Sequence, residues 1–547
     1  MNSTPSFMKR GAGAADTALI DCTSVIVGKG ATVDGSSIIS HCEDGGFLGR
    51  MKRVHGRKHQ KGAVIPLHDK DLQLTCEIPQ VSETYAFTQF WHSEARLGPM
   101  WSMPLSGMNE YGLVVVGPLR HTLSEPKTET THGLLMNLMS KHLHEFALER
   151  CKTAREAIEL MGNLVCKYGW FYAGVFITLT DGNESWAMEI IGAGSKWTPG
   201  CGKPGAVWVA ERIPDSDVCI YANRSRIGNV DLVDRDYFMG SSNIYSFAEE
   251  MGWWRQGEPF IWYDVYFPHG PDERDSTLRE WSALNWVAPS LGLNPETGRW
   301  PFSIRPDRPI SVEDVMAIHR DYLKTTPYDL TENSAWYVNG KKSPMTCPWG
   351  PGDLHNLIRI SPERSIGTYI TNWTHVDQVR TNLPDPIKGC MWVGFGPAAT
   401  TCFAPVYSGV TQFPESWTTT DKDKVNRQNS WWAFHLVDGL SFIKYQDVIK
   451  DIEAVRNPAE ACFLTQQPAI ESALTNLYFN RSQTGAPELA AKLATEYTNA
   501  CLKAVSEAWW KLFDYLLFKY YSRVSRDVVQ ELPVIKCPSL STIQCQH

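Results

Sequence analysis

The sequence lacks any run of apolar residues that could cross a membrane. A membrane-spanning helix needs roughly 18–20 such residues, and the densest apolar stretches here, such as residues 113–116, are only long enough for a strand. The segment 1–21 carries Lys9 and Arg10 with no apolar stretch after them, so it does not resemble a secretory signal. We therefore predict a cytoplasmic protein that does not bind membranes.

The sequence also has little that would bind nucleic acid, a metal or a nucleotide. Its formal net charge is −8 and no basic block stands out, which argues against nucleic acid as a partner. The 14 cysteines are scattered without a CxxC pair, and neither an HExxH motif nor a glycine-rich phosphate loop occurs. We therefore predict no metal and no cofactor, and we interpret most cysteines as reduced, buried residues.

The pattern changes abruptly at Cys22. Residues 1–21 are small, polar and aperiodic, which is typical of a flexible leader. Residues 23–27 are rich in strand formers, Asp34-Gly35 is a strong turn signal, and residues 36–40 form a second short strand. The sequence therefore predicts a β-hairpin that begins at Cys22 and whose second strand delivers a carboxylate.

The rest of the chain predicts a mixture of antiparallel strands and helices. The predicted strands are residues 174–179, 185–190, 207–210, 218–221, 365–370, 389–394 and 402–407. The predicted helices are residues 134–164, 311–323 and 487–521, and residues 253–310 are expected to be long ordered loops with a short helix near Arg279. We expect the last of these helices to pack on the body of the protein or on another subunit, and we predict a homo-oligomer.

A cysteine nucleophile needs a base, because the thiolate and not the thiol attacks. In one common arrangement the base is a distant histidine, and in another it is the α-amino group of the cysteine itself, whose pKa of about 7.7–8.0 suits neutral pH. The second arrangement requires Cys22 to be N-terminal, so Asp21–Cys22 would be a processing site. Removal of Met1 alone cannot expose Cys22, so self-cleavage or another protease is needed.

Several motifs, in order, resemble a known family. They are CTSVIVGKGATVDGSSII (22–39) followed by Glu43-Asp44, GMNEYGL (107–113), WAMEI (186–190), WVAERIPD (208–215), YANRSRIG (221–228), TPYDLT (326–331), LPDPI (383–387), PVYSG (405–409) and SWWAF (430–434). Together they resemble the dipeptidases of the C69 peptidase family over about residues 22–450. These are cysteine N-terminal-nucleophile hydrolases, related to secernins, penicillin V acylase and bile salt hydrolase.

The resemblance implies a fold and a set of roles. The fold would be α+β, a four-layer αββα sandwich, with residues 1–21 as a removed leader, 22–480 as the hydrolase domain and 481–547 as a C-terminal helical extension. Cys22 would supply the nucleophile and, once freed, the amine base. Asp44 would orient that amine, Asn109 would supply an oxyanion-hole side chain, and Asn223 would lie near the nucleophile.

Two further residues are candidates for the site. Arg279 could be the family's later arginine, but no tight motif anchors it and a surface ion pair is the alternative. His41 stands where many relatives have an arginine, three residues before the aspartate. Arginine is permanently charged and forked, and histidine is neither. His41 is therefore a partial cationic substitute at lower pH, a mark of different substrate preference, or a structural histidine.

The predicted function is hydrolysis of dipeptides through an S-acyl enzyme on Cys22. One alternative is an amidase that acts on a non-peptide N-acyl compound with the same machinery. Another is a non-enzymatic interaction protein similar to secernins. A papain-like Cys–His–Asn enzyme has no supporting local signature.

Overall fold

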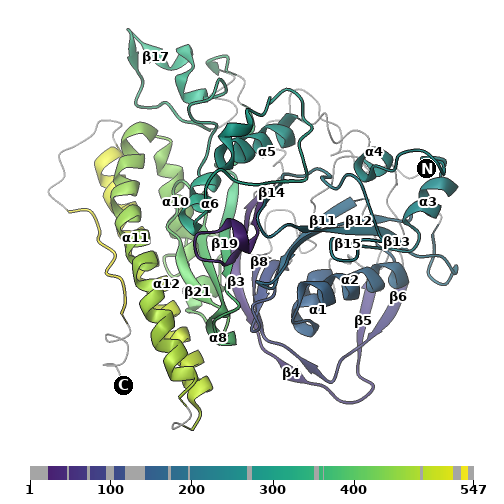
Figure 1. Cartoon of the computed structure of the whole chain (residues 1–547). Coiled ribbons are helices and arrows are strands. Elements are labelled where there is room, and N and C mark those ends of the chain that lie inside the picture. The colour runs from purple at the N-terminus through teal and green to yellow at the C-terminus, as the bar shows by residue number, and fades with distance from the viewer. Residues whose placement is uncertain are drawn as a thin grey trace.

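A computed structural model describes residues 22–45, 48–69, 74–93, 104–117, 142–170, 174–194, 197–267, 274–349, 357–360, 363–480, 484–521 and 531–539 (Figure 1). Two large antiparallel sheets form its centre, and helices contact each of them. The predicted leader, residues 1–21, lies outside the described residues.

The first sheet contains Cys22 and has seven strands in the order β16-β14-β1-β2-β19-β20-β21. Their bounds are β16 Ser303–Ile304, β14 Val218–Tyr221, β1 Cys22–Val27, β2 Ser37–Asp44, β19 Thr371–Val379, β20 Gly389–Phe395 and β21 Ala404–Tyr407. Strands β1, β2, β19 and β20 are buried at every position, as expected for strands that are covered on both faces. Cys22 therefore begins a strand in the interior of the protein.

The second sheet has eight strands in the order β15-β13-β12-β11-β10-β9-β8-β3. Their bounds are β15 Phe238–Gly240, β13 Ala206–Ile213, β12 Ser185–Gly192, β11 Gly174–Thr180, β10 Val114–Val116, β9 Pro104–Asn109, β8 Phe87–Ser93 and β3 Leu48–Val54. Three short antiparallel pairs stand apart from it: β4 Arg57–Lys58 with β7 Glu83–Thr84, β5 Val64–Asp69 with β6 Leu74–Pro79, and β17 Tyr337–Val338 with β18 Lys341–Lys342.

The two large sheets meet through aromatic and polar side chains. The Phe90 ring of β8 stacks on Trp373 and on His375 of β19, with ring centroids 5.3 and 5.1 Å apart. Ser106 Oγ of β9 lies 2.8 Å from His375 Nε2. Because buried polar groups need partners, this bond lets a histidine occupy the interface between the sheets.

Helices contact both sheets. In Figure 1, α1 Leu143–Arg150 and α2 Ala154–Tyr168 lie beside the eight-stranded sheet, and the long α11 Tyr445–Tyr478 and α12 Ala486–Tyr520 run along the opposite side of the molecule. The seven-stranded sheet also contacts α5 Arg274–Val287, α6 Val312–His319 and α10 Ser430–Ser441. The shorter helices are α3 Ile244–Glu250, α4 Trp262–Tyr266, α8 Asp385–Lys388 and α9 Glu415–Thr418.

The structure confirms the long C-terminal helix and corrects several other expectations. Helix α12 packs on α10, α11 and β21, and therefore on the body of the protein. The predicted strand at residues 365–370 is wrong, because those residues form bends and turns and the strand is Thr371–Val379. Its sequence, TNWTHVDQV, is so polar that it does not read as a buried strand. The homo-oligomer stays a prediction.

Three helical segments also differ from the prediction. The helix predicted at 134–164 is two helices, α1 and α2, and residues 134–141 lie outside the described residues. The helix near Arg279 runs for 14 residues. Helix α11 was not predicted, because Pro458 and Pro468 stand inside it and proline normally ends a helix. Among the described residues, no helix is both long and apolar enough to cross a membrane.

Candidate active site

Cys22 lies at the start of β1, with its side chain fully buried. Strand β2 pairs with β1 so that Glu43 lies opposite Cys22 and His41 lies opposite Ser24. Directly opposite residues of an antiparallel pair point to the same face of a sheet. The thiol, the Glu43 carboxylate and the His41 imidazole therefore share one face of the β1–β2 hairpin.

The Glu43 carboxylate connects the other two groups. Its Oε2 atom lies 3.2 Å from Cys22 Sγ and 3.1 Å from His41 Nε2, and His41 Nδ1 lies 2.9 Å from Ser24 Oγ. A neutral imidazole that donates from Nε2 to Glu43 accepts at Nδ1 from the Ser24 hydroxyl. Glu43 Oε2 then accepts two hydrogen bonds, one from the thiol and one from the imidazole.

Burial keeps both ionisable donors of this group neutral. It raises the pKa of the Cys22 thiol well above its ordinary value, and the Glu43 and Asp44 carboxylates add to that rise. Burial also lowers the pKa of His41, although the hydrogen bond to Glu43 acts in the opposite direction. At neutral pH, Cys22 is therefore a thiol that donates to Glu43, and His41 is a neutral imidazole. Its role as a cation at lower pH stays a prediction.

The main-chain atoms of Cys22 are held by two side chains from elsewhere in the sequence. The Cys22 nitrogen donates to Asn223 Oδ1 at 2.9 Å, and Arg279 Nη1 donates to the Cys22 carbonyl oxygen at 2.8 Å. Arg279 Nη2 also donates to Asn223 Oδ1 at 2.9 Å. Arg279 is fully buried, so the alternative of a surface ion pair is wrong.

A buried ion cluster holds Asn223 in place. Asn223 follows β14 and has a left-handed backbone, with φ of 64°, which an asparagine tolerates better than most residues. The next residues, Arg224 and Arg226, both donate to Glu280 Oε2, at 2.7 and 2.9 Å. Because Glu280 is the neighbour of Arg279 on α5, one helix fixes both side chains that hold Cys22.

Asp44 lies on the other face of the hairpin. Its carboxylate accepts from Thr371 Oγ1 at 2.6 Å and from Arg364. Burial raises the pKa of Asp44 to about 6, although Arg364, Thr371 and Arg279 act in the opposite direction. The Asp44 carboxylate therefore does not share the face of the Cys22 thiol, and its backbone N–H is the part of Asp44 that lowers the pKa of Cys22.

Asn109 is buried in the turn between β9 and β10. Its Nδ2 donates both hydrogens, to the carbonyl oxygens of Leu148 at 3.0 Å and Cys151 at 2.8 Å. Its Oδ1 accepts from the backbone nitrogens of Tyr111 and Leu113. An asparagine amide has only two N–H donors, so Asn109 ties a turn to α1 here and lends no hydrogen to Cys22.

The comparisons with known proteins agree with the motifs. Residues 21–457 match the sequence model of Peptidase family C69. The chain belongs to this family. It is 26% identical over 508 residues to a "Probable dipeptidase" of Latilactobacillus sakei, which covers 87% of this chain and 95% of that protein. It is also 26% identical to "Dipeptidase A" of Lactobacillus helveticus, over 78% of this chain and 83% of that protein.

One residue of this C69 peptidase site was missed from the sequence. The sequence motif indicates no role for Glu43 beyond its place before Asp44, yet its carboxylate lies within hydrogen-bond distance of the Cys22 thiol. Alternation along a strand could have found it, because only every second residue of β2 shares the face of Cys22. The sequence did not indicate the register of the hairpin, that is, which residue of β2 lies opposite Cys22.

The donor atoms of Cys22, His41 and Glu43 lie within 4.8 Å of one another, which is close enough for one metal ion. Sulfur, imidazole and carboxylate donors would suit zinc. The hydrogen bonds among the three groups account for their closeness without an ion. The sequence did not reveal this cluster, because its members come from two adjacent strands.

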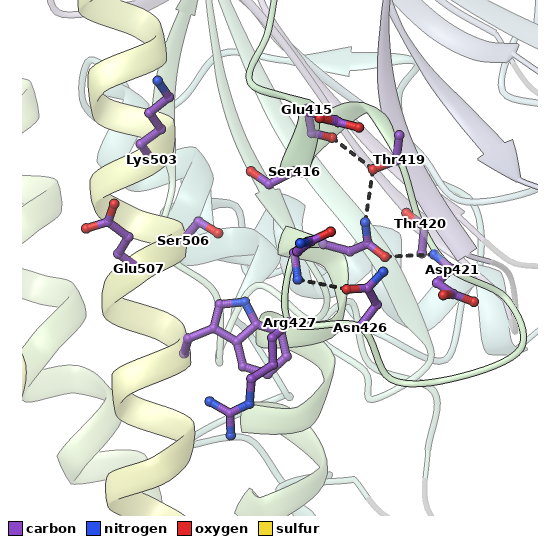
Figure 2. Close-up of a pocket in the computed structure, with 13 residues that line it drawn as sticks. Glu415, Ser416, Thr419, Thr420, Asp421, Asn426, Arg427, Lys503, Ser506 and Glu507 are labelled. Atoms are coloured by element: carbon purple, nitrogen blue, oxygen red, sulfur yellow. Dashed lines mark hydrogen bonds between the residues drawn. The ribbon is translucent and has the colours of Figure 1, made fainter.

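A polar cavity of about 630 Å³ lies elsewhere in the fold. Figure 2 shows Ser506 of α12 pointing toward the loop that contains Asn426, whereas Glu507 points away from it. Arg427 pairs with Asp514 of the same helix at 2.6 Å. None of the residues predicted for the active site lines this cavity.

Proposed function

We propose that this C69 peptidase is a dipeptidase that hydrolyses the peptide bond through an S-acyl enzyme on Cys22. Membership of the family and the names of its relatives support the reaction. The geometry of Cys22 carries the assignment of the nucleophile, because its nitrogen, its carbonyl oxygen and its sulfur are each held by a different buried side chain. Such positioning is what a nucleophile requires and what a structural cysteine does not.

The active form would be the chain that begins at Cys22. In the full-length chain the Cys22 nitrogen is a peptide amide, which cannot take a proton, and burial keeps the thiol protonated. Removal of residues 1–21 would turn this nitrogen into an amine with a pKa of about 7.7–8.0, next to the thiol. Asn223 Oδ1, which already accepts from this nitrogen, would orient the amine.

In the proposed reaction, the amine takes the proton of the thiol and Sγ attacks the carbonyl carbon of the substrate. The tetrahedral intermediate collapses, the leaving amine takes the proton, and water then hydrolyses the thioester. Asn223 and Arg279 lie at the main-chain atoms of Cys22 and would set the direction of attack. Asp44 would act from behind the hairpin by its charge, and Asn109 through the turn that it holds. The arrangement of layers would be the αββα sandwich of N-terminal-nucleophile hydrolases.

One experiment determines both the N-terminus of the mature chain and the class of substrate that it hydrolyses. The purified full-length product is analysed by intact mass and N-terminal sequencing, then assayed on a panel of dipeptides and of N-acyl amides, with Cys22→Ala beside it. We expect an N-terminus at Cys22 and hydrolysis of dipeptides in the wild type, and an intact leader without turnover in Cys22→Ala. Hydrolysis of N-acyl amides alone would favour the amidase, and full activity in a chain that keeps Met1 would exclude the amine base.

A further inference from the structure

Maturation poses a chemical problem that the mature enzyme does not have. If the proposed N-terminal nucleophile forms by self-cleavage, Sγ of Cys22 must attack before any α-amine exists. The amide nitrogen of Cys22 cannot act as a base, and burial keeps the thiol protonated. Another group must therefore accept the thiol proton in the full-length chain.

Among the residues that the structure describes, one carboxylate lies within hydrogen-bond distance of the thiol. Glu43 Oε2 lies 3.2 Å from Cys22 Sγ, and both residues are almost fully buried. The other nearby carboxylate, Asp44, is on the opposite face, where Arg364 and Thr371 bind it. His41 does not replace Glu43 as the acceptor, because its hydrogen bonds run to Glu43 and to Ser24.

We propose that Glu43 accepts the Sγ proton of Cys22 when the full-length chain cleaves its own Asp21–Cys22 bond, and that His41 positions the Glu43 carboxylate. This inference rests on the proposed N-terminal nucleophile. Glu43 contacts the reacting sulfur and is therefore a catalytic residue of maturation. His41 acts only through Glu43.

The steps balance with water as the single co-reactant. Glu43 takes the proton from Sγ, and the sulfur forms a bond to the carbonyl carbon of Asp21. The bond from that carbon to the Cys22 nitrogen breaks, and the nitrogen takes the proton back from Glu43 to become the α-amine. Water then hydrolyses the thioester, which releases residues 1–21 with a terminal carboxylate and regenerates the thiol.

The identity of residue 41 fits this role. A guanidinium is permanently charged and forms strong, paired hydrogen bonds to a carboxylate, which would stabilise the anion and weaken it as a proton acceptor. The neutral His41 imidazole supplies one donor at 3.1 Å and fixes Oε2 between itself and the thiol. The histidine thus orients Glu43 with less loss of basicity than an arginine at position 41 would cause.

The first experiment measures maturation directly. Wild type, Glu43→Gln, Cys22→Ala and Cys42→Ala are made in a cell-free system of purified components, and intact mass spectrometry follows the loss of residues 1–21. Glu43→Gln should mature at least about 100-fold more slowly than wild type, since a general base contributes about 10²–10⁴-fold. Cys42→Ala, a change of the neighbouring residue that points to the other face, should mature close to the wild-type rate.

A chain that does not need self-cleavage separates an effect on maturation from an effect on folding or on turnover. We call it the bypass chain. Residues 1–21 are replaced by a sequence that an added protease removes directly before Cys22, and Glu43→Gln is introduced into this chain. After external cleavage, its dipeptide hydrolysis should fall by no more than about 10-fold, because the α-amine now serves as the base. A Glu43→Gln chain that is equally impaired in both assays would overturn the specific role in maturation.

The outcomes distinguish this inference from the proposed function. If Glu43→Gln matures at the wild-type rate and Cys22→Ala does not mature, the role of Glu43 is overturned, but self-cleavage by Cys22 is not. Maturation of Cys22→Ala would exclude self-cleavage and with it this inference, but not the dipeptidase. A wild type that is active with its leader attached would exclude the N-terminal nucleophile itself.

Two further variants test the positioning role of His41. His41→Ala should slow maturation by about 10-fold, and His41→Gln, whose amide can donate to Glu43 in place of Nε2, should recover most of that loss. Because His41 acts through Glu43, adding His41→Ala to Glu43→Gln should cause no further slowing. If the two substitutions slow maturation additively in the double variant, His41 has only a structural role. The same holds if His41→Gln matures no faster than His41→Ala.

Discussion

The two faces of the β1–β2 hairpin each bury a carboxylate, but with different partners. On one face, Glu43 accepts from the Cys22 thiol and from the imidazole of His41, which are both neutral donors. On the other face, Asp44 accepts from the Thr371 hydroxyl and from the Arg364 guanidinium. Residues 43 and 44 are neighbours in the chain, but side chains alternate along a strand. The carboxylate of residue 44 therefore has a charged partner, whereas that of residue 43 accepts from two neutral donors.

This difference separates proton transfer from charge compensation. A guanidinium partner offsets part of the cost of burying a carboxylate, and leaving one member of such a pair buried without the other costs several kcal/mol. Cys22 and His41 give the Glu43 carboxylate hydrogen bonds without an opposite charge, and the adjacent thiol can give it a proton. The Cys22 face is therefore suited to chemistry, and the Asp44 face is suited to holding the hairpin in place.

The largest expected effect in this comparison is that of Asn223→Gly. Glycine tolerates the φ of 64° without strain, so the change removes the amide that links Cys22 to Arg279 and leaves the backbone in place. In the bypass chain, kcat/KM for a dipeptide should fall by about 10²–10³-fold, the loss that follows removal of one preorganised group at a reacting centre. Stability should fall by only about 2 kcal/mol, for two buried donors that lose their acceptor.

Asn339→Gly is the matched control for this variant. Asn339 has a similar left-handed backbone, with φ of 52°, in the exposed turn between β17 and β18. Its replacement should leave both kcat/KM and the unfolding midpoint in urea at their wild-type values. If Asn223→Gly loses no more activity than the control, Asn223 has no role in the active site.

The Asp44 face is tested by the pH dependence of stability. Burial raises the pKa of Asp44 to about 6 from an unfolded value of 3.8, so its protonation stabilises the fold below about pH 4 and that contribution is lost as the pH rises through 6. Asp44→Asn lacks this titration. The difference in unfolding free energy, wild type minus variant, should therefore fall by up to about 3 kcal/mol between pH 4 and pH 7.

Urea unfolding of both chains at pH 4, 5, 6 and 7 measures this difference. If the unfolding free energies of wild type and Asp44→Asn change in parallel from pH 4 to pH 7, the Asp44 carboxylate does not titrate in that range. The dipeptidase activity of Asp44→Asn should fall less than that of Asn223→Gly, because its side chain points away from the thiol.

Much of the hairpin could be predicted from the sequence, but its register could not. The strands beside Cys22 are apolar and rich in branched residues, so β1 and the start of β2 read correctly. A tight turn at Asp34-Gly35 would have placed Cys22 opposite a residue four positions beyond Glu43. The actual connection is longer and contains a one-turn 3-10 helix at Lys29–Ala31. This shift of four residues leaves Glu43 on the face of Cys22 and brings it directly opposite the thiol.

The partners of Cys22 from distant segments were predictable only in part. Asn223 came from a motif, whereas Arg279 had no local signature because its role depends on where α5 packs. Its burial follows from contacts with the carbonyl oxygen of Cys22 and with Asn223, which no periodicity of α5 encodes. The strand β19 was misplaced for a similar reason, since its polar residues are satisfied by side chains of other strands, such as Ser106 with His375.

The smallest expected effect is that of Cys42→Ala, which changes a thiol only one residue from Glu43. Cys42 points to the Asp44 face, where its sulfur lies 3.9 Å from Asp44 Oδ2, and burial raises its pKa well above the ordinary value. Removal of this neutral sulfur leaves a small cavity and should cost about 1 kcal/mol in a urea titration, with dipeptide hydrolysis within about twofold of wild type. A large loss of activity would mean that the two faces are coupled through the strand, and the separation between chemistry on one face and support on the other would have to be abandoned.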